Sequence, residues 1–99
     1  MKLVITAAAE ADLKAIGDYI AQDNPARAVS FIRELERCCQ EIAEMPQAWQ
    51  LVPRYETQGI RRRVHGRYLI FYSTSTNQIT VLHVLNGAMD YEAILFPQP

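Results

Sequence analysis

After a short N-terminal segment, the hydrophobic periodicity of this chain changes from helical to strand-like near residue 59. Between residues 7 and 45, apolar residues recur every three or four positions, as they do along one face of an α-helix. From Gly59 onward they alternate with polar residues or form short runs, which is the pattern of β-strands. Because a strand-like segment at residues 2–6 precedes the helical part, the sequence predicts an α+β domain with the element order β-α-α-β-β-β.

The helical part divides into two helices at Asn24-Pro25. The first helix is predicted over residues 7–22, and the second extends to about Met45. Asn24 can cap the second helix, and Pro25 suits its first position because no N–H is needed there. The two helices are therefore expected to form an antiparallel hairpin. The apolar positions of the first helix include Leu13, Ile16 and Ile20.

Three strands are predicted after the helices, at residues 60–65, 68–72 and 79–85. We expect an antiparallel meander, with the helical hairpin packed on one face of a small antiparallel sheet. The other face, with the arginine-bearing strand, is expected to stay partly open. Residues 90–96 resemble a short closing helix or an extra strand. A chain of 99 residues has room for one core, so residues 1–99 are expected to form a single domain.

Charge is distributed unevenly between the two halves of the chain, although the net charge is only −1. Residues 1–50 carry five basic and eight acidic residues, a net of −3, whereas residues 51–99 carry five basic and three acidic, a net of +2. Four of the arginines in the second half lie between Arg61 and Arg67. A focused positive patch on a nearly neutral protein favours one anionic site or acidic partner over nonspecific adsorption.

The most prominent local feature is the basic strand at residues 60–65. Alternation places Arg61, Arg63 and His65 on one face. Guanidinium groups bind phosphate or carboxylate through two parallel hydrogen bonds, so these residues are candidates for an anion-binding surface. The alternative is a solvated strand face on which arginine discourages edge-to-edge aggregation.

Other candidate residues lie on the last two strands. Alternation predicts that Val81, His83 and Leu85 share a face, which favours a hydrogen-bonded structural histidine over a general base. Tyr68 and Tyr72 share a face of the central strand, where core packing is favoured over base stacking. The spacing of residues suggests no Ser/His/Asp or Cys/His arrangement and no glycine-rich phosphate loop.

The two cysteines, Cys38 and Cys39, are adjacent and are interpreted as small buried residues of a reducing compartment. Their spacing is not that of a metal site, and neither a metal nor a cofactor is expected. The N-terminus does not resemble a signal peptide, and no apolar run approaches the ~20 residues that span a bilayer. The expected location is the bacterial cytoplasm.

The ordered series of motifs resembles the ParE branch of the RelE/ParE superfamily of type II toxin–antitoxin toxins. The likeness extends over nearly the whole chain, in order and with suitable spacing. The stretches that carry it are Ala11–Ile16, Tyr19-Ile20-Ala21, Asn24-Pro25, Gly59–Arg62, Gly66–Tyr72 and Val81–Gly87.

This resemblance implies the β-α-α-β-β-β fold and a cognate antitoxin that wraps an extended or helical segment over the toxin. ParE toxins trap DNA gyrase in complex with cleaved DNA, whereas RelE toxins cut mRNA on the ribosome. The expected activity is therefore gyrase inhibition by the free toxin, through binding rather than an enzymatic reaction. The antitoxin is expected to neutralise this activity in a toxin–antitoxin hetero-oligomer. Partner-binding residues are expected at Leu13, Ile16 and Ile20 for the antitoxin, and at Arg61, Arg62, Arg63 and Arg67 for an anionic partner.

The chain departs from its relatives in the last strand and the turn after it. Relatives commonly have arginine at His83, histidine at Asn86 and arginine at Met89, so basic character is lost here. This change disfavours the alternative of a ribosome-dependent mRNA endonuclease, whose candidate residues would be Arg61, Arg63, Arg67 and His83. A third possibility is a weakly toxic homologue that only binds the antitoxin.

Overall fold

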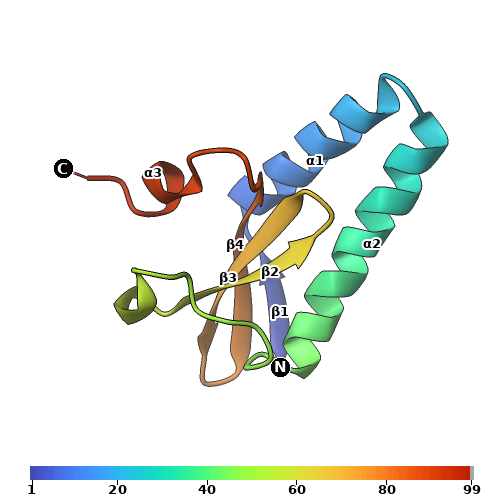
Figure 1. Ribbon diagram of the computed structural model, residues 1–99. Helices are drawn as coiled ribbons and strands as arrows, with labels where there is room; N and C mark the ends of the chain where they lie inside the picture. The colour runs from blue at the N-terminus through green and yellow to red at the C-terminus, as the bar shows by residue number, and fades with distance from the viewer. Residues whose placement is uncertain (99) are drawn as a thin grey trace.

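The predicted order of elements is confirmed by the structure, a computed structural model that describes residues 1–98 (Figure 1). Two long helices lie on one side of a sheet, and a short helix and a long loop lie on the other. The elements are β1 (Lys2–Ile5), α1 (Ala7–Ala21), α2 (Pro25–Glu44), a 3-10 turn η1 (Glu56–Gln58), β2 (Ile60–His65), β3 (Tyr68–Ser75), β4 (Gln78–Asn86) and α3 (Tyr91–Leu95).

The sheet has the strand order β1-β4-β3-β2. β2, β3 and β4 form the predicted antiparallel meander, but β1 pairs with β4 in the parallel direction. The sheet is therefore mixed, and the expectation of a purely antiparallel sheet is wrong for β1. A parallel pair needs a long connection between its strands, which the helical hairpin and the meander supply together.

Both long helices begin at side-chain caps. The hydroxyl of Thr6 accepts a hydrogen bond from the Ala9 amide at 3.1 Å, and it also donates to the carbonyl of Val81 at 2.9 Å. The start of α1 is therefore fixed to β4. Asn24 caps α2 by accepting from the Arg27 amide at 3.0 Å, as predicted.

The helices approach each other closely at Gly17. A Cβ at this position would lie 3.4 Å from Cγ1 of Ile32 on α2, at the close end of ordinary van der Waals contact, so alanine would fit without a shift of the helices. The glycine costs roughly 1 kcal/mol of helix propensity relative to alanine.

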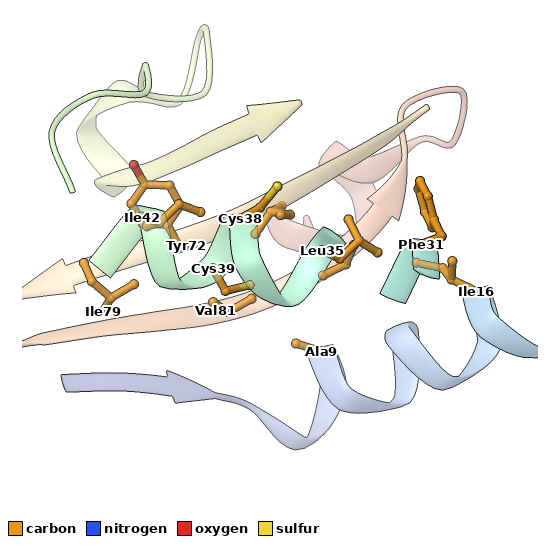
Figure 2. Close-up of a cluster of buried hydrophobic side chains, with 12 residues drawn as sticks. Ala9, Ile16, Phe31, Leu35, Cys38, Cys39, Ile42, Tyr72, Ile79 and Val81 are labelled. Atoms are coloured by element: carbon orange, nitrogen blue, oxygen red, sulfur yellow. The ribbon is translucent and has the colours of Figure 1, made fainter. Parts of the chain in front are cut away.

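The main core lies between the helices and the sheet (Figure 2). Residues of α2 face those of the strands, and the two cysteines are both buried and unbonded. Burial raises the pKa of the Cys39 thiol to about 11. Tyr72 is fully buried and donates its hydroxyl to the carbonyl of Pro46 at 2.8 Å, which confirms its core role. Fully buried members include Leu35, Ile42, Ile70, Ile79 and Val81.

A second, smaller cluster covers part of the opposite face of the sheet. Its buried residues are Val52, Leu69, Phe71 and Leu85. The loop after α2 and the C-terminal segment pack on them, and the rings of Tyr55 and Phe96 stack at 4.0 Å between centroids. The face that was expected to stay partly open is therefore covered along β3, while Val64 of β2 remains 63% exposed.

The alternation predicted for the last strand is interrupted by a bulge. Tyr72 pairs with Val81 but the preceding Phe71 pairs with His83, which leaves Leu82 as an extra residue. Val81 consequently belongs to the main core and Leu85 to the second cluster. The prediction that Val81, His83 and Leu85 share one face is therefore wrong, because strict alternation assumes an unbroken ladder.

Residues 90–96 form the predicted closing helix rather than an extra strand. Asp90 caps α3 by accepting from the Ala93 amide at 3.3 Å. Among the helices formed by residues 1–98, none is both long and apolar enough to cross a membrane.

Candidate functional site

The basic strand β2 brings Arg61, Arg63 and His65 to one face, as predicted, and that face packs against α2 and the loop that follows it. The guanidinium of Arg61 donates to the carbonyl of Trp49 and to the side-chain oxygen of Gln47, both at 2.6 Å. Arg61 therefore ties the loop to the edge strand.

Arg63 is bound even more completely. Its guanidinium forms an ion pair with Glu41 at 2.7 Å and donates to the carbonyl of Cys38 at 3.2 Å. The same group lies 4.4 Å from the centroid of the Trp49 ring, in a cation–π contact. With a side chain only 16% exposed, Arg63 joins β2 to α2.

His65 and Glu34 form the other connection between β2 and α2. Nε2 of His65 lies 2.8 Å from the Glu34 carboxylate, and Nδ1 lies 3.6 Å from the Cys38 sulfur. Arg27, two turns earlier on α2, donates to the same carboxylate at 2.5 and 3.5 Å. The Arg27 hydrogen bond, and secondly that of His65, lower the pKa of Glu34 to about 2.

The remaining arginines of the basic segment lie elsewhere. Arg62 points to the opposite face and donates to the hydroxyl of Tyr91 at 2.9 Å. Arg67 is exposed in the turn between β3 and β2, where its carbonyl accepts from the Gly87 amide at 2.8 Å. The four arginines that were predicted as one anionic-partner surface therefore do not converge on a single patch.

His83 is held at the other edge of the sheet by α1. Its Nδ1 lies 2.8 Å from Oδ2 of Asp12, and the same oxygen accepts the Val84 amide at 2.9 Å. β1 ends at Ile5, so the backbone of β4 beyond Val81 has no strand neighbour on this side. Asp12 of α1 provides the acceptor there. These contacts support the interpretation of His83 as a hydrogen-bonded structural residue.

The candidate nuclease residues are consequently dispersed. Arg61 and Arg63 contact α2 and its following loop, His83 contacts α1, and Arg67 lies in an exposed turn. General acid–base catalysis needs its groups within hydrogen-bond reach of one substrate. Among residues 1–98, no group of three or more His, Cys, Asp or Glu residues could hold a metal ion.

The helical hairpin carries an apolar groove on its surface, hereafter the hairpin groove. Two adjoining hollows of about 380 and 530 Å³ share Gly17 and Ile32 in their walls. Val29 is 54% exposed although it is apolar. The apolar residues of the groove are Ile5, Leu13, Gly17, Ala21, Pro25, Ala28, Val29 and Ile32.

The three apolar residues predicted on α1 have different positions relative to this groove. Leu13 lines it, Ile16 is buried at 7% exposure, and Ile20 is half-buried against the main core. Sequence reasoning missed Val29, whose signal is an apolar side chain just off the core-facing stripe of α2.

A helical hairpin on one face of a four-stranded mixed sheet is the α+β fold of ParE-type proteins. The family described as "ParE toxin of type II toxin-antitoxin system, parDE" matches residues 3–91, and the chain belongs to it.

A solved structure, the "Chromosomal ParDE TA system from P. aeruginosa", has the same fold, with a TM-score of 0.70. It is 22% identical in sequence, and the match covers 87% of this chain and 95% of that one. A search of curated proteins finds no match.

Proposed function

We propose that the protein is the toxin of a ParDE-type pair, which inhibits DNA gyrase when it is free of its cognate antitoxin. The observation that carries this proposal is the family match over residues 3–91. The dispersion of Arg61, Arg63 and His83 supports a toxin that acts by binding rather than by cutting RNA. Such a protein acts in the bacterial cytoplasm, where gyrase and DNA are found.

The antitoxin binds in the hairpin groove. An amphipathic helix lays its apolar face into a groove of this kind, with anchors at helical spacing. The rims carry both signs of charge, from Lys14 and Asp18 on α1 and from Arg33 and Glu36 on α2. Salt bridges at such rims fix orientation and register more than they add affinity.

Of the four arginines expected to contact an anionic partner, Arg67 is best placed to contact gyrase. Its side chain is exposed. The other three are held within the molecule: Arg61 bonds Trp49 and Gln47, Arg62 bonds Tyr91, and Arg63 pairs with Glu41. The three engaged arginines instead hold the loop, α3 and α2 around the edge strand.

A gyrase assay tests the activity. Toxin separated from its antitoxin should cause cleaved DNA to accumulate with purified gyrase, and the intact complex should not. Supercoiling that is unchanged over a broad range of toxin concentration would refute gyrase as the target. Discrete new 5′ ends in cellular mRNA after induction, found by primer extension, would instead establish the ribosome-dependent nuclease.

Val29→Glu tests the antitoxin site. A carboxylate placed in an apolar interface loses its hydration without a partner, so affinity for the antitoxin should fall at least ~10-fold in isothermal titration calorimetry. Val29 is already 54% exposed, so the fold should tolerate the change. The matched control is Met45→Glu, at a residue 58% exposed at the end of α2 and outside the groove. Equal affinity of both variants would exclude the groove.

A further inference from the structure

We propose that a second cleft, between α1 and the end of β4, binds an arginine side chain of the antitoxin. This inference rests on the proposed antitoxin partnership, but it concerns a different surface from the hairpin groove. The α1–β4 cleft has a volume of about 290 Å³. It is lined, among others, by Asp12 and Tyr19 of α1, Tyr68 of β3, Asn86 of β4, and Met89.

The charge of the cleft is one-sided. Asp12 is its only acidic residue, and no lysine or arginine is among its lining residues. Oδ2 of Asp12 is engaged by His83 and by the Val84 amide, whereas Oδ1 has no hydrogen-bond partner within residues 1–98. The Asp12 side chain remains 21% exposed. A carboxylate with one oxygen available beside apolar walls favours a cationic ligand.

The walls suit a guanidinium in particular. Tyr19 is 69% exposed, so core packing does not explain this large aromatic side chain. Tyr68 is half-buried and packs on Phe31 at 5.6 Å between ring centroids, which holds it in place. Guanidinium groups stack on aromatic rings and pair with carboxylates at the same time. Met89, 48% exposed, provides flexible apolar surface for the aliphatic stem.

The size of the cleft favours a single side chain over a free small molecule. Pockets for small ligands usually measure ~300–1,000 Å³ and enclose most of the ligand. This cleft is at the lower limit, at about 290 Å³, and its walls combine buried residues such as Val84 with exposed ones such as Tyr19 and Met89.

The position of the cleft connects it to the hairpin groove. Ile16 and Tyr19 of α1 line the cleft, whereas Gly17, Asp18 and Ala21 line the groove on the other flank of the same helix. A peptide segment that leaves the groove by crossing α1 therefore reaches the cleft. A neutral apolar anchor in the cleft would remove water from Asp12 without replacing it, which is unfavourable.

Binding of a free arginine derivative tests the chemistry of the cleft. N-acetyl-arginine amide should cause saturable NMR shifts at the amides of Tyr19, Tyr68 and Asn86. The neutral isostere N-acetyl-citrulline amide should bind at least ~10-fold more weakly, since it cannot pair with Asp12. Equal shifts with both compounds, shifts located elsewhere, or no saturation would overturn the proposal.

Two substitutions of Tyr19 test the partner. Tyr19→Ala should weaken binding of the cognate antitoxin at least ~10-fold, while Tyr19→Phe keeps the ring and should bind as the wild type does. If the antitoxin binds the wild type and Tyr19→Ala equally, the arginine site is refuted and the proposed function stands. If the wild type binds no antitoxin, the proposed function fails. The arginine titration still decides whether the cleft prefers a cationic ligand to a neutral one.

Discussion

At the scale of single residues, Glu34 shows how one carboxylate can join several segments. It accepts from Arg27 within α2 and bonds His65 on the edge strand. These contacts lower its pKa from the ordinary 4.5 to about 2. Because the folded-state pKa is depressed, the stabilisation is present above about pH 4.5 and is lost as the pH falls toward about 2.

Glu34→Gln should therefore flatten the acid side of the stability profile. Wild-type melting temperature should fall between about pH 4.5 and about pH 2 more steeply than that of the variant, because only the wild type must protonate this carboxylate. Thermal unfolding followed by circular dichroism at several pH values measures the difference. Glu36→Gln, at an exposed position of the same helix, should keep the wild-type slope. Parallel curves for the wild type and Glu34→Gln would contradict the prediction.

At the scale of elements, Asp12 attaches α1 to the sheet at a second point, beyond the contact made by Thr6. Its Oδ2 accepts from the Val84 amide on the part of β4 that has no strand neighbour. Asp12→Ala removes this acceptor and leaves His83 unpaired, so it should cost about 1–3 kcal/mol of unfolding free energy. Urea denaturation measures it.

Asp18→Ala is the matched control on the same helix. Asp18 pairs with Lys14 at 2.7 Å, but its side chain is 67% exposed and Lys14 is 78% exposed. Solvent screening leaves exposed pairs of this kind with little effect on stability, so the control should unfold almost as the wild type does. A loss for Asp12→Ala no larger than for the control would show that the Asp12 contacts do not contribute to the attachment of α1.

Secondary structure was predictable from the sequence because caps and periodicity are local signals. Asn24-Pro25 and the alternation in residues 60–65 placed α2 and β2 correctly. The environment of each strand face was not predictable in the same way. Arg61 and Arg63 share a face as expected, but their partners Trp49 and Glu41 lie 12 and 22 positions away in sequence, and no local pattern shows that they meet. The bulge at Leu82 was equally hidden, because the pattern of apolar residues does not show where the pairing of two strands shifts by one residue.

At the scale of the whole molecule, the second face of the sheet depends on contacts between two distant segments. Arg54 pairs with Glu92 at 2.6 Å, and Tyr55 stacks on Phe96 with the rings within 1° of parallel. These segments cover Phe71, which is fully buried. A 99-residue chain buries a limited fraction of its surface, so a second cluster adds stability that the main core alone does not provide.

Phe96→Ala should loosen this cover without disturbing the main core. Phe96 is only half-buried, so the loss should be about 1–2 kcal/mol, below the 3–5 kcal/mol typical of a fully buried phenylalanine. Hydrogen exchange should accelerate in α3, where the Phe96 amide bonds the carbonyl of Glu92, while amides of Ile70 keep their protection. Phe96→Leu retains part of the apolar area, so its stability should lie between those of the wild type and Phe96→Ala. Uniform acceleration at Ile70 and in α3 would instead mean that the two clusters unfold as one unit, and that the C-terminal segment belongs to the global folding core.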